Sequence, residues 1–538
     1  MKRISRCSKN DPTSRSSLTS RGRRAISLTS VSTFLVLAVG SAIAAPAIFG
    51  ELARVSGRSP FPEGCGAHSL DPTGGDIEAA TPQIDSEVEP HIAVDPTDPD
   101  KMISAWIQDR HPDGGGGRSN VVGVSKDGGR SWKQVVVPGI SECTGGRYAR
   151  ATDPWLDFGP DGVAYLASLS FEQTEPSTIL VSTSADGGET WGVPGEVTPT
   201  GQNAAHGADA YNDKQALTAH PTIPGRAYVV WVKRVPMQTA GANTAMFSST
   251  SDHGQTWSTP TPLFAAGAFV LPVGSEILVL PDGTLLHVFS LGNLLDGVLP
   301  EGPPRVPFRI MVQRSTDDGV SWSLPQVLGG GTRTIARDPD TGEVVTALNF
   351  LPSADVAPDG TVYVSWGDLD SVPRRIEVVS SRDGGNTWTD PTAAATSPAD
   401  LMLPALAVGH GGTVAVTYYS FENDVPGDSE LTTDVWFVHS QDGGATWERS
   451  HLAGPFDMRQ APMNGGGRFV GDYTGLDAIP GTGSSMAHGL EKFAAALSLA
   501  PPIALEGQSD IFVVTTTVTG KGRSGGGSPE RSMHRASE

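Results

Sequence analysis

Six aspartates recur in one short pattern, Ser/Thr-x-Asp-x-Gly-x-Ser/Thr-Trp, as in SKDGGRSW from Ser125. They are Asp127, Asp186, Asp252, Asp317, Asp383 and Asp442, spaced 59, 66, 65, 66 and 59 residues apart. A carboxylate in a glycine-containing loop is a candidate Ca²⁺ ligand, but a calcium site needs about six to eight oxygens and each copy brings one carboxylate. The alternative is structural, because aspartate accepts hydrogen bonds from its own turn and glycine adopts positive φ at little cost. We therefore expect six bracing turns, each covered by its tryptophan.

A second set of residues, at the starts of predicted strands, could do acid–base or binding chemistry. The set is Glu89, His91, Asp153, Trp155, Asp213, Lys214, Glu276, Asp355, Asp472 and Tyr473. Two carboxylates about 5–10 Å apart can cleave a glycosidic bond. The structural alternative is a turn at Asp153-Pro154, a core position for Trp155 and a closing turn at GDYTGL.

The segments between the tryptophan turns share one order of short strands. In the fifth, LPSADVAPDG, TVYVSWGDLD, RIEVVSSRDGG and NTWTDP follow one another, with period-two alternation and turn residues between them. Comparable second strands are MISAWIQD from Met102, VAYLASLS from Val163, AYVVWVKR from Ala227, LLHVFSLG from Leu285 and VAVTYYSF from Val414. One four-stranded antiparallel sheet per repeat of this length is typical of a propeller blade. We predict an all-β fold, a β-propeller of four-stranded antiparallel blades.

Residues 81–518 are predicted to form the propeller, with seven blades as our interpretation and six as the alternative. After the sixth turn, RFVGDYTGLDAIPG from Arg468, EKFAAALSLA and SDIFVVTTTV supply three strands of a further unit. Residues 45–80 form an N-terminal segment, and DIEAATPQ from Asp76 is a candidate for the strand that closes the ring. Residues 519–538 have the composition of a flexible tail.

The N-terminus has the three parts of a secretory signal peptide. Basic residues are followed by the apolar run VSTFLVLAVGSAIAA from Val31, and Ala42 and Ala44 stand at signal-peptidase spacing. We predict cleavage after residue 44 and secretion. Arg23 and Arg24 resemble a twin-arginine signal, with the general secretory route as the alternative. An uncleaved membrane anchor is the alternative to cleavage.

The predicted mature chain is acidic and has two cysteines. Removing residues 1–44 leaves 30 basic and 58 acidic residues, a formal charge of −28. This charge excludes nucleic acid and anionic membranes as expected partners and favours Ca²⁺ or cationic partners. Cys65 and Cys143 are expected to form a disulfide in an exported protein. The histidines at 91, 206, 220, 287 and 439 have no metal-ligand spacing, so we propose no zinc site and leave the metal unknown.

The six tryptophan turns and the blade pattern resemble the BNR or Asp-box repeat proteins, above all the sialidase superfamily. The resemblance covers nearly all of the mature chain and implies a propeller with its ligand site at the channel mouth. A sialidase uses three arginines for the sialic carboxylate, a Tyr nucleophile relayed by Glu, and an Asp acid/base. The first arginine normally stands in an Arg-Ile-Pro motif, but the equivalent segment here is VEPHIAVDP, with Val88 and Glu89 before Pro90.

The resemblance implies roles for particular residues. As a glycosidase, the protein would use Tyr473 as nucleophile or substrate contact and Asp153 or Asp213 as acid/base, while Arg150 and Arg468 hold an acidic group. Trp155 and Asp472 complete the predicted substrate contacts. We expect a secreted sialidase-like glycoside hydrolase acting on extracellular glycans or glycoproteins, with no required cofactor and Ca²⁺ as a candidate ligand of the acidic mouth. The alternative is a non-catalytic propeller that binds protein, glycan or cell-wall material.

Overall fold

The computed structural model describes residues 46–66, 81–113, 115–171, 177–198, 211–235, 242–267, 270–293, 306–333, 335–483 and 488–519. The predicted signal peptide, His206, the Asp76–Ala80 part of the candidate closing strand and the tail from residue 520 lie outside these residues. In the part of the chain described, no helix combines the length and the hydropathy that crossing a membrane requires.

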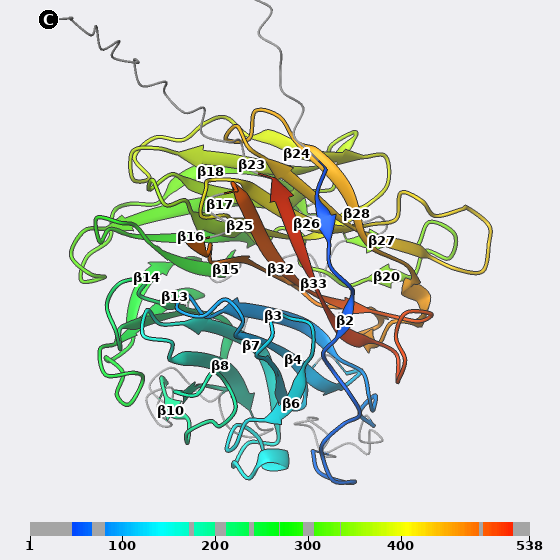
Figure 1. Ribbon diagram of the computed structural model, residues 1–538, viewed down its shortest axis with the longest axis horizontal. Helices are drawn as coiled ribbons and strands as arrows, with labels where there is room; N and C mark the ends of the chain where they lie inside the picture. The colour runs from blue at the N-terminus through cyan, green and yellow to red at the C-terminus, as the bar shows by residue number, and fades with distance from the viewer. Residues whose placement is uncertain are drawn as a thin grey trace, which may run out of the picture. The chain divides into compact units, whose positions relative to one another are not determined.

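The blade strands of the described residues form antiparallel sheets, as predicted (Figure 1). The first eight strands of the propeller are β3 (Val88–Val94), β4 (Met102–Arg110), β5 (Gly117–Ser125), β6 (Lys133–Val136), β7 (Arg150–Phe158), β8 (Ala164–Phe171), β9 (Thr178–Ser184) and β10 (Gly195–Glu196). A single pairing, between Gly117 of β5 and Ala151 of β7, joins the first two sets of four into one sheet. The next two sheets are four-stranded: β11 (Tyr211–Ala219), β12 (Ala227–Arg234), β13 (Thr244–Thr250) and β14 (Thr261–Ala265), then β15 (Val270–Val279), β16 (Leu285–Asn293), β17 (Val306–Ser315) and β18 (Gln326–Arg333).

Two further four-stranded sheets and a closing sheet complete the propeller. Their strands are β21 (Ser353–Val356), β22 (Val362–Asp368), β23 (Arg374–Ser381) and β24 (Thr392–Ser397); β25 (Leu401–Val408), β26 (Val414–Ser420), β27 (Thr432–Ser440) and β28 (Glu448–Asp457); and β31 (Gly475–Ile479), β32 (Leu490–Leu499) and β33 (Asp510–Thr519). The innermost strands β3, β7, β11, β15, β21, β25 and β31 pack in this order, and β31 also packs against β3. We interpret these strands as the innermost strands of seven blades.

The N-terminal segment supplies the strands outside β33. Both β1 (Ile48–Phe49) and β2 (Ala53–Arg54) pair antiparallel with β33. In Figure 1 the blue β2 lies beside the red β33. The outer partner of the last blade therefore comes from residues 48–54, earlier in the chain than the segment around Asp76. The predicted disulfide joins Cys65 to Cys143. Cys143 lies within the short 3₁₀ turn η1 (Glu142–Thr144).

A small accessory sheet is inserted between blades. It pairs β19 (Ala336–Arg337) and β20 (Val344–Val345) with β29 (Met463–Asn464) and β30 (Gly467–Arg468). The 3₁₀ turn η4 (Met458–Gln460) precedes it and carries Arg459, which makes a double hydrogen bond to Asp338. The hairpin of β29 and β30 also contacts the first blade, where Met463 N–H donates to Gln83 and Gly465 N–H donates to Pro112.

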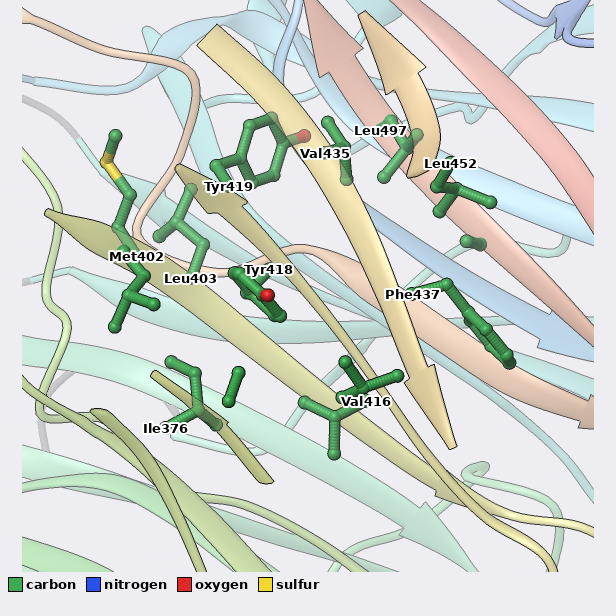
Figure 2. Packing of buried hydrophobic residues seen from close by; sticks show 14 of the residues in the cluster. Ile376, Met402, Leu403, Val416, Tyr418, Tyr419, Val435, Phe437, Leu452 and Leu497 are labelled. Atoms are coloured by element: carbon green, nitrogen blue, oxygen red, sulfur yellow. The ribbon is translucent and has the colours of Figure 1, made fainter. Parts of the chain in front are cut away.

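Alternating apolar side chains fill the space within and between the blades. Figure 2 shows this packing around β26, where Val416, Tyr418 and Tyr419 lie among residues of β25, β27 and β32. The largest fully buried side chains include Trp106, Trp231 and Trp366, and each comes from the second strand of its sheet. The β-branched and aromatic composition of the predicted second strands therefore has a direct packing role.

Each tryptophan-turn aspartate is the hydrogen-bond centre of its turn. Asp186 accepts from the N–H and hydroxyl of Thr190 at 2.9 and 2.6 Å, and from the hydroxyl of Ser184 at 2.7 Å. The indole N–H of Trp191 donates to the Gly188 carbonyl at 2.9 Å. The same hydroxyl and N–H contacts recur at the five other aspartates. These contacts brace the hairpin between the third and fourth strands of the blade.

Carboxylates on the innermost strands link neighbouring blades. Asp477 of β31 accepts from Val94 N–H of β3 at 2.8 Å, and Asp157 of β7 accepts from Ala219 N–H of β11 at 2.8 Å. Glu276 of β15 accepts from Ala354 N–H of β21 at 3.1 Å, and Asp355 of β21 accepts from Val408 N–H of β25 at 2.7 Å. All four carboxylates line a cavity of about 220 Å³ in the channel.

Burial makes these channel carboxylates weak acids. It raises the pKa of Asp157 and Asp477 to about 7, of Glu276 to about 8 and of Asp355 to about 6. Their mutual repulsion adds to the shift of Asp157, Glu276 and Asp477, whereas the hydrogen bonds from the next blade oppose it. The channel therefore favours its protonated state below neutral pH.

The first prediction concerns the tryptophan turns. Asp186→Ala removes three hydrogen bonds and is expected to lower the free energy of unfolding by about 1–2 kcal/mol in urea denaturation. Hydrogen bonds from Thr190 and Ser184 outweigh burial and lower the pKa of Asp186 to about 2. The stabilisation is therefore present above about pH 4 and lost as pH falls toward 2. An Asp186→Ala protein as stable as the wild type at pH 7 would contradict the bracing role.

The second prediction concerns the channel. Because the folded pKa of Asp477 is raised, its contribution to stability is complete below about pH 4 and is lost as pH rises through about 7. Asp477→Asn keeps an acceptor for Val94 N–H and removes the ionisation. We expect the variant to lose less stability than the wild type between pH 5 and 8, by on the order of 3 kcal/mol. Unfolding curves at both pH values test this, and identical pH dependences would show that Asp477 does not titrate in the channel.

Candidate active site

In five of the innermost strands, a backbone bulge places one residue at the channel mouth. The pairing register of the innermost strand shifts next to Glu89 in β3, Asp153 in β7 and Lys214 in β11. These three residues have φ of 54°, 48° and 49°, in the left-handed region that costs a non-glycine residue energy. Gly274 of β15 and Leu403 of β25 take the same conformation at corresponding shifts.

The residues around the mouth fall into a charged group and an uncharged group. The bulge residues Glu89, Asp153 and Lys214 bring charge, and Asp472, in the segment before β31, joins them. The bulge residues Gly274 and Leu403 bring none, and Leu351, in the segment before β21, lines the channel with them. A cavity of about 500 Å³ opens over the charged group, with an apolar wall made by Leu271, Val273, Leu348 and Phe350. A charged floor beside an apolar wall is typical of a small-ligand site.

Lys214 lies at the centre of the charged group. Its Nζ contacts Asp472 Oδ2 at 2.7 Å, Asp153 Oδ1 at 3.0 Å and Glu89 Oε1 at 3.2 Å. Because the three carboxyl groups share one ammonium, their contacting oxygens lie within about 6 Å of one another. Asp472 has the most exposed side chain of the three acids, at 15% against 5% for Asp153 and 2% for Glu89. Asp472 is thus the acid most open to a ligand.

The buried acids of this cluster differ in protonation. Burial raises the pKa of Glu89 to about 8, the carboxylates of Asp153 and Asp472 add to the rise, and Lys214 opposes it. Burial acts in the same direction on Asp153, but Lys214 and a hydrogen bond from Glu89 outweigh it and lower the pKa of Asp153. Lys214 keeps its proton because its three acidic partners raise its pKa against the effect of burial. Near neutral pH the Glu89–Asp153 pair therefore holds one proton beside an ammonium.

Tyr473 lines the channel cavity, and its ring centroid lies 5.7 Å from Lys214 Nζ. Its hydroxyl donates to the Pro154 carbonyl at 3.0 Å, and its ring packs against Trp155 with centroids 5.4 Å apart. Burial and the nearby carboxylates of Glu89 and Asp153 raise its pKa well above the ordinary value. Trp155 in turn packs on His91, whose Nδ1 accepts from Leu156 N–H. Tyr473, the predicted nucleophile, is therefore a protonated phenol whose hydroxyl hydrogen is engaged in a hydrogen bond to Pro154.

The other predicted site residues lie in different surroundings. Asp213 lines the cavity, where Arg234 contacts it at 2.8 Å and also covers the ring of Tyr211. Arg150 does not line the cavity but donates to Asp113 and to the Gly115 carbonyl. Arg468 lies in the accessory sheet, where it contacts Glu343 at 3.1 Å. The structure thus brings Tyr473, Asp153, Trp155 and Asp472 together, with Asp213 on the cavity wall, and neither predicted arginine lines the cavity.

Two cavity arginines were missed from the sequence. Arg110 ends β4 and Arg234 ends β12, the second strands of their sheets. In an antiparallel pair the end of the second strand lies beside the start of the innermost one, as the pairing of Tyr211 with Arg234 shows. Arg110 and Arg234 could have been predicted from their positions at the ends of predicted second strands.

The described residues contain no cluster of side chains arranged as a metal site. No group of three or more His, Cys, Asp or Glu residues in this part of the chain is arranged to hold an ion. The ammonium of Lys214 occupies the place among the mouth carboxylates that a cation would need. Calcium binding stays a prediction.

The chain is similar to BNR repeat proteins. Residues 218–453 match the family model of the BNR repeat-like domain, which confirms the resemblance seen in the tryptophan turns. No curated protein matches the chain.

Solved structures similar to this chain include three enzymes. A Penicillium chrysogenum alpha-L-arabinanase complexed with arabinobiose has 13% identity and a TM-score of 0.43, and the match covers 87% of this chain and 98% of that one. A Fusarium graminearum alpha-L-arabinofuranosidase, also with arabinobiose, has 13% identity, a TM-score of 0.42 and coverages of 86% and 97%. A Hadza microbial sialidase has 15% identity, a TM-score of 0.42 and coverages of 77% and 74%.

The third prediction tests the charge balance at the mouth. Lys214→Met leaves three buried acids without their ammonium and is expected to destabilise the protein by about 3–5 kcal/mol at pH 8. The loss should shrink at pH 5, because protonation of the acids removes their repulsion. Unfolding at both pH values measures it. Lys233→Met, on the same strand pair as Lys214 and without a carboxylate contact in the described residues, is the matched control. Equal effects of the two substitutions would contradict the balance.

Proposed function

We propose that the protein is a secreted glycoside hydrolase that cleaves neutral extracellular glycans with carboxylates rather than with a tyrosine. The observation that carries the proposal is the cluster of Glu89, Asp153 and Asp472 around Lys214 on the floor of the 500 Å³ cavity. A disulfide between Cys65 and Cys143 suits an oxidising compartment and supports export.

The cluster offers both groups that glycoside cleavage needs. The proton shared by Glu89 and Asp153 can be donated to the leaving oxygen, as general acid catalysis requires. Asp472, the most exposed acid, attacks the anomeric carbon and forms a glycosyl ester as the protonated leaving group departs. Water then hydrolyses this ester and returns a proton to the Glu89–Asp153 pair. Because Asp153 and Asp472 oxygens lie within about 6 Å of each other, the separation suits a nucleophile and a retaining reaction better than a water-activating pair.

The charges of the cavity favour a neutral sugar. The three cations Arg110, Lys214 and Arg234 face the carboxylates of Asp153, Asp213 and Asp472, while Glu89 is protonated near neutral pH. The floor thus has no net positive charge to offset the carboxylate of a sialic acid. The donated hydroxyl of Tyr473 and the pairing of Arg150 with Asp113 and of Arg468 with Glu343 also argue against sialidase chemistry.

A non-catalytic glycan-binding propeller is the second candidate. Lys214 favours it, because an ammonium fixed between three acids also serves as a purely structural counter-ion. Binding of a glycan without turnover by protein of wild-type stability would support this candidate.

The fourth prediction tests the reaction. The purified protein is assayed with 4-methylumbelliferyl arabinofuranoside, galactoside, glucoside, glucuronide and sialoside. We expect turnover of a neutral glycoside, with kcat reduced about 10²–10⁴-fold in Asp472→Asn and in Asp153→Asn and changed little in Tyr473→Phe. Because the Glu89–Asp153 proton is lost as pH rises through about 8, kcat/KM should fall there. Proton NMR should show retention at the anomeric carbon.

The outcomes separate the alternatives. Sialoside turnover abolished by Tyr473→Phe would replace the proposal by sialidase chemistry. Inversion of the anomeric centre would keep the hydrolase and exclude Asp472 as nucleophile. The absence of turnover from folded protein, together with glycan binding, would leave the second candidate. Circular dichroism and urea unfolding of each variant control for loss of fold.

A further inference from the structure

Arg110 is an unusual arginine because it is buried and almost without partners. Its exposed fraction is 4%, yet the described residues give its side chain one hydrogen bond, from Nη2 to Asn464 Oδ1 at 2.8 Å. Its Nε is buried without an acceptor, and no carboxylate in the described ranges lies within salt-bridge distance of it. Arg118 and Arg150, also buried, each bind a carboxylate and a main-chain carbonyl.

A buried guanidinium with few hydrogen bonds lowers the stability of the folded protein unless other acceptors bind its N–H donors. Arginine has five N–H donors, and a buried donor without an acceptor costs about 1–3 kcal/mol or more. Burial also lowers the pKa of Arg110, because removal from water disfavours the charged form. Since Arg110 lines the 500 Å³ cavity, those Nη donors that bind no protein acceptor can be satisfied by a molecule that enters it.

Two neighbours hold the guanidinium in place without using up its donors. The ring of Phe469 lies 5.0 Å from the guanidinium carbon and supports it from one side. Asn464 belongs to the hairpin of β29 and β30, which hydrogen bonds anchor to the first blade at Gln83 and Pro112. The hairpin therefore acts as a positioning element for Arg110.

We infer that Arg110 is a substrate-binding residue that recognises a pair of adjacent hydroxyl groups on a neutral sugar. This inference rests on the proposed function, because it assigns a contact within the same cavity. A planar guanidinium can donate two parallel hydrogen bonds to two neighbouring oxygens. The acids Glu89, Asp153 and Asp472 act on Arg110 through space and disfavour a second anion beside it. Hydroxyl groups accept from Arg110 and donate to these acids, so a neutral diol satisfies both sides.

The test measures binding, stability and the dependence on one hydroxyl pair. Saturation-transfer NMR and calorimetry are used with methyl α-L-arabinofuranoside, methyl β-D-galactopyranoside, methyl β-D-glucuronide and methyl α-sialoside. Arg110→Met is expected to weaken binding of the neutral glycoside at least tenfold. It should also leave Tm unchanged or raise it, because it removes a charge that lacks a partner in the free protein.

Two further variants complete the design. Arg459→Met removes an arginine that is paired with Asp338 and does not line the cavity, so Tm should fall while glycoside binding stays at the wild-type level. Arg110→Lys keeps the charge but not the planar fork, and it should also lose at least tenfold in binding. A deoxy analogue of the bound sugar that lacks one contacted hydroxyl should bind wild type and Arg110→Met alike.

Each other result has a definite meaning. Unchanged affinity in Arg110→Met or, if that variant does not fold, in Arg110→Lys overturns the inference. A large fall in Tm for Arg110→Met with retained affinity assigns a structural role instead. Binding of the glucuronide or sialoside alone, or of none of the four probes, also overturns it. Because binding is measured without turnover, binding without hydrolysis overturns the proposed reaction and leaves this inference standing.

Discussion

The innermost strands impose the constraint on which the rest of this structure depends. Each is the edge of its sheet, and neighbouring edges meet around the channel without forming a continuous ladder. Their N–H groups still need acceptors, because unpaired buried donors are costly. Asp157, Glu276, Asp355 and Asp477 supply them by reaching across to the next blade. The acidity of the channel is therefore first a requirement of closing the propeller.

The same constraint explains where chemistry can arise. Below the mouth, each carboxyl group is committed to a neighbouring strand and its pKa is raised by burial. At the mouth, bulges in β3, β7 and β11 each turn one residue out of the ladder, so Glu89, Asp153 and Lys214 interact with one another instead. Left-handed φ at these residues costs energy that the surrounding pairs offset. The bulge converts a structural position into one that can exchange protons or bind a ligand.

The fold could be predicted from the sequence because each of its signals involves only neighbouring residues and recurs in several blades. Tryptophan turns, period-two strands and their spacing each require only a few neighbouring residues, and they located the second strands at Met102, Ala227, Leu285 and Val414. The mouth residues Asp153, Asp472 and Tyr473 were found for the same reason, since each lies near the start of an innermost strand. Their states were not predictable, because the Tyr473 hydroxyl meets Pro154, a residue more than 300 positions away in the chain. Arg468 was misplaced by its proximity to Asp472 in sequence, although the chain turns between them into the accessory sheet.

The residues at the channel mouth differ between blades, although the blades repeat one fold. If only closure mattered, the bulges would carry similar residues, yet three of them carry Glu89, Asp153 and Lys214 while two others carry Gly274 and Leu403. Asp472 joins the charged group from the segment before β31. Placing like charges in all the blades would exceed what one ammonium can balance in a buried site. Confining them to consecutive blades lets Lys214 serve three acids at once and leaves an apolar wall opposite. A site with a polar floor and an apolar side fits a sugar, whose rings present both kinds of surface, better than it fits an ion. The asymmetry of the mouth is thus the part of this symmetric fold that structural need alone does not explain.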